Sequence, residues 1–203
     1  MSSPTDRRLA RGAETRESIL QAASDLLLTG VAGTTMRAVA ERAGVPISLV
    51  HYHFKSKRQL LREVLKRQNE TALARRRAAT QPDGELAVDW HASIVDLRTD
   101  LRAGNARILW ELWVAALEDE DLAELWRDAI GSWHDLLDDA VSSSLEASGA
   151  DLPIEPRLIA ALVTCTLLGA EAARLGAIPE DQLPVLEALE ALAAIAQPIV
   201  KQR

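Results

Sequence analysis

Apolar residues recur along most of this chain with the three- and four-residue spacing of helices that bury one face. The pattern predicts a helix over 14–28, two short helices within 34–57 and a long helix over 57–79. No stretch alternates apolar and polar residues in the way that a half-buried strand would. We therefore expect an all-α protein.

A break follows these helices, because Gln81-Pro82-Asp83-Gly84 combines proline and glycine in one short segment. Beyond it, the pattern predicts five more helices, over about 85–101, 104–117, 121–147, 155–175 and 181–200. The total is then about nine helices. We expect a flexible basic arm over 1–12, a small three-helix domain over 13–56, a connecting helix over 57–80 and a larger helical domain over 81–203.

The stretch 34–57 carries the local signals of two helices joined by a tight turn. Thr34 or Thr35 can cap the first helix through a side-chain oxygen. Gly44 can end it, because a residue without Cβ enters the left-handed conformation cheaply. Pro46 suits the start of the second helix, where a missing N–H costs nothing. These signals predict a helix-turn-helix.

The second short helix exposes more side chains than its packing needs. Val50 and Phe54 form its inward side at helical spacing. Its outward side holds Ile47, Ser48, Leu49, His51, Tyr52 and His53. A helix this short is not stable in isolation, so its outward aromatic and imidazole groups need another explanation. Binding in the major groove of DNA supplies one. A generic helical hairpin is the alternative.

The distribution of charge changes how the net charge of −7 is interpreted. Residues 1–80 hold 15 Lys and Arg against 7 Asp and Glu, a net charge of +8, whereas residues 81–203 carry −15. A basic head suits the phosphate backbone of DNA, and an acidic body avoids non-specific adhesion to it. The alternative is that each half is only a solvated charged surface.

The order of residues in this stretch is more specific than a helical hairpin requires. It runs Thr-x-Arg-x-x-Ala-x-x-Ala-Gly-Val from Thr35, then Val-His-Tyr-His-Phe from Val50 and Lys-Ser-Lys from Lys55. Over roughly residues 14–62, the chain resembles the N-terminal domain of the tetracycline-repressor (TetR) family of bacterial regulators. That resemblance implies a repressor that binds a pseudo-palindromic operator as a homodimer and is released by a small molecule. A TetR-like activator is an alternative.

The resemblance also implies which side chains meet DNA. Arg37 could grip both acceptors of a guanine, and the apolar residues at the front of the second helix suit thymine methyl groups. Thr35 and Lys57 match phosphate contacts. The full set is Thr35, Arg37, Ile47, Ser48, Leu49, His51, Tyr52, His53 and Lys57. Two features depart from the family, which often has tyrosine in place of His51 and a Ser-x-Gly segment in place of residues 46–48.

All five tryptophans lie beyond residue 80. Each alone suits core packing, but together they could line a cavity between helices, where bundles commonly bind small ligands. The predicted effector site comprises Trp90, Ile94, Trp110, Trp113, Leu117, Trp126, Trp133, Glu111 and Glu171, with His91 and His134 near it. Aromatic faces beside a carboxylate suit an organic cation, and a neutral apolar compound fits equally well. The tryptophan-rich middle looks somewhat like the choline-repressor branch of the family.

The last two predicted helices carry small and apolar residues on more than one face, which is more than one partner helix needs. We interpret them as half of a four-helix bundle between two copies of the chain, as the resemblance also implies. The dimerisation residues are Leu162, Thr166, Ala170, Ala173, Leu189, Ala193 and Ala196. Burial within one subunit is the alternative.

Other functions find little support in the sequence. We see no trustworthy metal-ligand spacing, no phosphate-binding glycine loop and no nucleophile–base motif, so we expect no metal, no cofactor and no enzymatic activity. We expect Cys165, the one cysteine, to be buried. We find neither a signal peptide nor a membrane-spanning stretch, which favours the cytoplasm. A helical adaptor that binds a protein through the hairpin is the alternative to a DNA-binding regulator.

Overall fold

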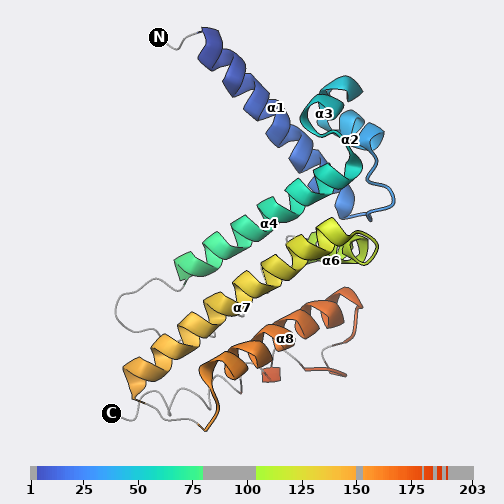
Figure 1. The fold of residues 1–203 in the computed structure, drawn as a ribbon. Coiled ribbons are helices and arrows are strands. Elements are labelled where there is room, and N and C mark those ends of the chain that lie inside the picture. The colour runs from blue at the N-terminus through green and yellow to red at the C-terminus, as the bar shows by residue number, and fades with distance from the viewer. Residues whose placement is uncertain are drawn as a thin grey trace. The chain divides into compact units, whose positions relative to one another are not determined.

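The computed structural model describes residues 4–79, 104–149, 153–179, 181–184, 187–188 and 191. Every helix or strand assigned in these residues is an α-helix, which confirms the predicted class. The helices are α1 Pro4–Leu27, α2 Met36–Ala43, α3 Ile47–His53, α4 Lys57–Ala79, α6 Asn105–Ala116, α7 Glu120–Ser148 and α8 Pro156–Leu175 (Figure 1).

The observed helix ends lie close to the predicted ones. The bounds of α4 are as predicted, and those of α6, α7 and α8 differ from the prediction by a single residue at any end. The predicted helix over 85–101 lies outside the described residues, as does nearly all of the one over 181–200. The largest difference is in α1, because the segment that we expected to be a flexible arm over 1–12 is helical from Pro4 onward. Asp6 lies in the first turn of α1, where a negative charge interacts favourably with the helix dipole.

Residue contacts divide the chain into two compact units. Unit 1 comprises Met1–Gln68 and Arg107–Arg127, and unit 2 comprises Asn69–Ala106 and Asp128–Arg203. Helices α1, α2 and α3 therefore belong to unit 1 and α8 to unit 2, while α4, α6 and α7 each contribute to both. The predicted DNA-binding residues all lie in unit 1.

The core of unit 1 forms where α2 and α3 pack against α1. Val39 and Ala40 of α2 and Val50 of α3 are buried, as the helical spacing predicted. The largest side chains buried in unit 1 are Phe54, Ile19, Leu27, Leu60, Leu65, Leu112 and Leu122. The short helices α2 and α3 are therefore stabilised by a shared apolar core rather than by their own length.

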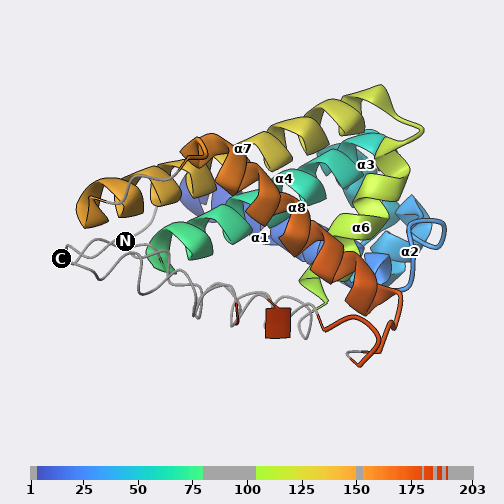
Figure 2. The ribbon, with the colours of Figure 1, turned by 90° about the horizontal axis from the view of Figure 1, so that it is seen from below.

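In unit 2, α8 packs beside the second part of α7 (Figures 1 and 2). The buried side of α8 is formed by small residues, which let two helices approach closely, together with Val163 and Glu171. Trp133 and Val141 are buried on α7. This packing places an aromatic ring and a carboxylate in the interior of the same unit.

Two features of α8 differ from what its sequence predicts. Cys165 is exposed rather than buried. In addition, Pro156–Leu175 is long and apolar enough to cross a membrane by length and composition, although we expected no such stretch. Core helices of soluble proteins satisfy the same criterion, so this finding is weak evidence for a membrane span. Cys165 is exposed because it lies off the side of α8 that is buried in unit 2. The helix meets the membrane criterion because its composition is apolar along its whole length.

Candidate functional site

The start and end of α2 are set by side-chain and backbone hydrogen bonds. Thr35 is its N-cap, because the Oγ1 atom accepts a hydrogen bond from the Ala38 amide at 3.1 Å. Thr34, the other candidate cap, is fully buried and donates from Oγ1 to the Gly30 carbonyl at 3.1 Å. Gly44 ends α2 with φ 67°, and its amide donates back to the Ala40 carbonyl. The turn between the two short helices is therefore the predicted one.

The outward face of α3 is exposed as predicted. Val50 and Phe54 are fully buried, so these two residues account for how α3 is anchored. On the opposite side Tyr52 is 79% exposed. The other exposed residues are Ile47, Ser48, Leu49 and His51. His53 is half-buried, and its ring meets the Tyr52 ring edge-to-face at 5.1 Å.

A cation from α1 helps to hold the end of α3. The Arg16 guanidinium lies 5.3 Å from the centre of the Phe54 ring, within the range of a cation–π interaction. The same guanidinium forms an ion pair with Glu63 of α4. Arg16 therefore connects α1 to α4 and contacts Phe54, the residue that follows α3. The sequence analysis did not identify this role.

Arg37 and Lys57, the two predicted cationic contacts, lie in different surroundings. Arg37 is on the surface of α2, where its Nε pairs with the Glu41 carboxylate at 3.0 Å. Lys57 is half-buried at the start of α4, and its Nζ donates to the Val31 carbonyl at 2.6 Å. Lys57 is therefore bonded to the protein backbone in addition to any contact with DNA.

A variant of the capping box, in which the glutamine side chain accepts from the residue before the N-cap, begins α4 and was not predicted from the sequence. The Ser56 Oγ accepts a hydrogen bond from the Gln59 amide at 3.2 Å, and the Gln59 side chain accepts one from the Lys55 amide at 2.9 Å. The spacing Ser-x-x-Gln is the signal that could have identified it. These bonds fix the chain between α3 and Lys57.

Asp25 of α1 links two helices of unit 1. Its carboxylate accepts hydrogen bonds from the Gln21 side chain at 2.9 Å and from Arg42 of α2 at 3.0 Å. The Gln21 hydrogen bond and the positive charge of Arg42 outweigh burial and lower the pKa of Asp25 below its usual value. The ionised carboxylate thus connects α1 to the far end of α2.

The predicted effector residues do not gather at one place within the described structure. Trp90, Ile94 and His91 lie outside the described residues. In unit 1, Trp110 and Trp113 stack edge-to-face at 5.0 Å, Trp126 is half-buried and Leu117 is 68% exposed. Glu111 accepts a hydrogen bond from the Val31 amide at 2.9 Å and pairs with Arg107 at 2.7 Å.

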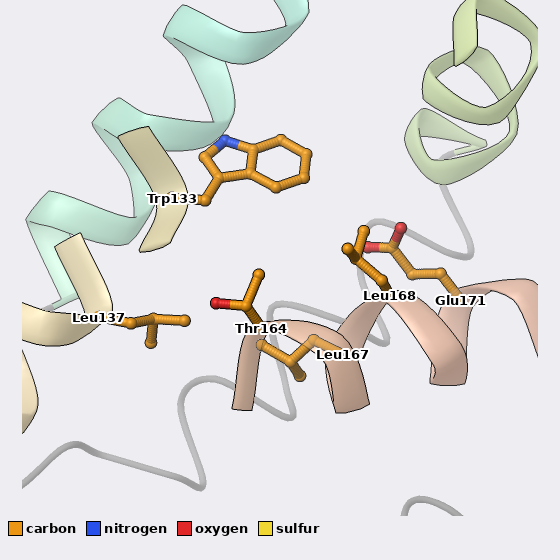
Figure 3. Close-up of a pocket in the computed structure, with 6 residues that line it drawn as sticks. All are labelled: Trp133, Leu137, Thr164, Leu167, Leu168 and Glu171. Carbon is orange, nitrogen blue, oxygen red and sulfur yellow. The ribbon is translucent and has the colours of Figure 1, made fainter. Parts of the chain in front are cut away.

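Unit 2 contains a small cavity between α7 and α8 (Figure 3). The side chains that face it are Trp133, Leu137, Thr164, Leu167, Leu168 and Glu171. Two of the predicted residues, Trp133 and Glu171, therefore meet there, and both are almost fully buried. The cavity measures about 10 Å³, roughly the space for one water molecule. His134 is half-buried on α7 and does not line it.

Sequence reasoning missed the other four lining residues, because leucine and threonine on an apolar helix give no signal that distinguishes a cavity wall from a core. The described residues also include no group of three His, Cys, Asp or Glu side chains that could hold a metal ion.

The predicted dimerisation residues of α8 fall on both sides of the helix. Leu162 is 65% exposed and Thr166 is exposed, whereas Ala170 and Ala173 are buried within the subunit. Leu158, one turn before Leu162, is also exposed. The remaining predicted residues, Leu189, Ala193 and Ala196, lie outside the described part of the chain. The exposed leucines form an apolar stripe on α8.

Comparison with known proteins identifies the family of this chain. Residues 19–64 match the family model described as bacterial regulatory proteins, tetR family. An uncharacterized HTH-type transcriptional regulator of Mycobacterium tuberculosis is 32% identical over 192 residues, covering 88% of this chain and 94% of the relative.

Two solved structures share the fold. A transcriptional regulator from Rhodococcus sp. Rha1 has a TM-score of 0.72 at 24% identity, over 89% of this chain and 94% of the other. A regulator from Saccharomonospora viridis, solved in complex with choline, has a TM-score of 0.77 at 18% identity, over 88% and 95% of the two chains.

Proposed function

The chain belongs to the tetR family of bacterial regulatory proteins, and on this premise we propose that it is a repressor that binds a pseudo-palindromic operator as a homodimer and is released by a small molecule. The family consists of DNA-binding transcriptional regulators and not of enzymes. Beyond membership of this family, we propose that the protein represses transcription, that it forms a homodimer and that a small molecule releases it from DNA. Activation by the same protein is the alternative outcome.

The outward face of α3 is the observation that carries this proposal. Val50 and Phe54 account for the anchoring of α3, yet the helix also presents exposed leucine, isoleucine, tyrosine and histidine side chains. A cluster of exposed apolar and aromatic side chains of this kind marks a surface that binds a partner. The net charge of +8 over residues 1–80 favours a polyanionic partner.

We assign the DNA contacts from this exposed surface. Arg37 reads a guanine edge, and Ile47 and Leu49 contact thymine methyl groups. Ser48, His51, Tyr52 and His53 contact base edges or the sugar–phosphate backbone, and Thr35 contributes a further backbone contact. Lys57 keeps two ammonium donors beyond the one used for Val31, so it can also reach a phosphate.

A second copy of the chain would cover the apolar stripe on α8. Leu158 and Leu162 are exposed one turn apart, and a two-fold interface would bring this stripe against its own copy. A dimer would present two recognition helices to half-sites about 34–36 Å apart on the same side of the duplex.

For the effector, we propose an organic cation or an apolar compound that binds at the cavity between α7 and α8. The buried Trp133 ring and Glu171 carboxylate suit a cation, and the leucines suit an apolar group. Choline bound to the structural neighbour from Saccharomonospora viridis favours the cation. Because the cavity holds about one water molecule, the effector would have to bind a more open form. Such a preference for one conformation is what could release DNA.

We also propose that the protein acts in the cytoplasm, since a bacterial operator is found there.

A gel shift tests the function directly, with the DNA that flanks the gene and with a duplex selected by the protein from a randomised library. We expect specific binding that weakens steeply with salt. Tyr52→Ala should weaken binding by roughly tenfold on all sequences, because it removes a backbone contact. Failure of the wild-type protein to select any duplex would contradict a DNA-binding role and favour the protein adaptor.

A further inference from the structure

The turn between α1 and α2 is held from two sides through the backbone of one residue. The Val31 amide donates to the Glu111 Oε2 atom of α6 at 2.9 Å. The Val31 carbonyl accepts from the Lys57 Nζ atom of α4 at 2.6 Å. All three residues belong to unit 1. Side chains of α4 and α6, which are distant in sequence, therefore both bond to the backbone of Val31 in the turn between α1 and α2.

This segment leads directly to the first predicted DNA contact. Gly30 has φ 120°, a conformation that residues with a side chain rarely adopt, so the chain turns sharply there. The Thr34 amide then donates to the Val31 carbonyl at 3.2 Å, and the Thr35 amide donates to the Gly33 carbonyl at 2.9 Å. The position of Val31 therefore determines where Thr35 caps α2.

Glu111 is positioned to hold the turn between α1 and α2, because its carboxylate bonds to the Val31 amide and is mostly buried. Its side chain is 17% exposed, and its second oxygen pairs with Arg107 at 2.7 Å, which orients the carboxylate. A hydrogen bond from a backbone amide to an ionised carboxylate is stronger than one between neutral groups. Loss of the carboxylate would leave the Val31 amide without this acceptor.

We infer that Glu111 is a positioning residue for operator binding, which acts through Val31 to hold Thr35 and Arg37 of the α2 helix in place. The inference rests on the proposed DNA-binding function. It also reassigns Glu111, which the sequence analysis had placed in the effector site. Glu111 does not touch the DNA in this arrangement and contributes no phosphate contact.

The sign of the expected effect makes the inference testable. Removing an acid from a DNA-binding unit strengthens binding when charge alone matters, because repulsion of the phosphates decreases. Positioning predicts the opposite result for Glu111. Glu118, an exposed acid that follows α6 in the same unit, provides a control of equal charge. The two substitutions should therefore change operator affinity in different directions.

The experiment compares Glu111→Ala, Glu111→Gln and Glu118→Ala on the duplex selected by the wild-type protein, over a series of salt concentrations. We expect Glu111→Ala to weaken binding by roughly tenfold, with the slope against salt unchanged because no phosphate contact is lost. Glu111→Gln retains an acceptor and should restore much of the affinity. Glu118→Ala should bind as well as the wild type or slightly better. Amide hydrogen exchange at Val31 should be faster in Glu111→Ala than in the wild type.

Wild-type affinity in Glu111→Ala, or unchanged exchange at Val31, would overturn the inference while leaving the proposed function intact. If Glu111→Ala does not fold, Glu111→Asp decides the question, because it keeps the charge but its shorter side chain withdraws the carboxylate from the Val31 amide. A loss of affinity at constant salt slope then supports positioning, and no loss overturns it. If the wild-type protein binds no duplex, both the proposed function and this inference fail.

Discussion

Arg37 and Lys57 bring positive charge to the same predicted interface, but their surroundings predict different mutant behaviour. Lys57→Ala should weaken binding to all sequences and reduce the slope of affinity against salt by about one, because one phosphate contact is lost. Arg37→Ala should also relax the base preference at one position, at a cost of about 1–3 kcal/mol on the best site. Gel shifts on the selected duplex and on single-base variants would measure both effects.

Lys57 also holds Val31, and the salt dependence of binding can separate this structural role from a phosphate contact. Its bond to the Val31 carbonyl means that Lys57→Ala also loosens the turn before α2. A loss of affinity with no change in salt slope would show that Lys57 acts only through Val31 and would contradict the phosphate contact. Unchanged affinity would contradict the proposed docking altogether.

Asp25 makes the stability of unit 1 depend on pH. Its pKa is lowered in the folded protein from the ordinary value of 3.8, so its ionised form favours folding. This contribution is fully present above about pH 4 and is lost as the pH falls through the lowered pKa. Asp25→Asn should therefore lower the melting temperature at neutral pH, and the difference from the wild type should shrink towards pH 2. A difference that stays constant with pH would contradict the ion pair.

At the scale of elements, the turn between α2 and α3 depends on the conformation of Gly44 rather than on space around it. A Cβ added at Gly44 meets nothing within 4 Å, but φ is 67°. Gly44→Ala should therefore destabilise the protein by roughly 1–2 kcal/mol through backbone strain alone. Chemical denaturation followed by circular dichroism would measure this.

Gly131, in the interior of α7, is the matched control for Gly44. It also has open space at the Cβ position, and no left-handed φ is recorded there. Gly131→Ala should stabilise the protein by roughly 0.5–1 kcal/mol, because alanine loses less backbone entropy in a helix. Equal effects of the two substitutions would contradict the conformational explanation.

The elements were the most predictable part of this protein. Helical spacing, Gly44 and Pro46 are local signals, and α2, α3 and α4 formed where they indicated. The start of α1 was not predictable, because polar residues near a chain end are compatible with both a helix and an arm. The exposed side of α8 was not predictable either, since apolar residues on several faces do not show which face the same chain covers.

At the scale of the whole molecule, the exposed stripe on α8 predicts the assembly. Leu162→Glu should convert the dimer to monomers, because a charge would be buried at the two-fold interface. Val114→Glu, at a residue 50% exposed on α6, is the control and should remain dimeric. Sedimentation velocity would measure the mass, and the gel shift should show weaker operator binding for Leu162→Glu alone. A dimeric Leu162→Glu would remove α8 from the proposed interface.

The sequence by itself determined the helical class, the order of the helices, the helix-turn-helix and the outward face of α3, because each depends on residues within a few turns of one another. Only the tertiary structure decided that Glu111 and Lys57 hold Val31, that Arg16 covers Phe54, and that Trp133 and Glu171 share a cavity. These contacts join residues far apart in the chain. Their partners depend on how the helices pack, which local spacing does not encode.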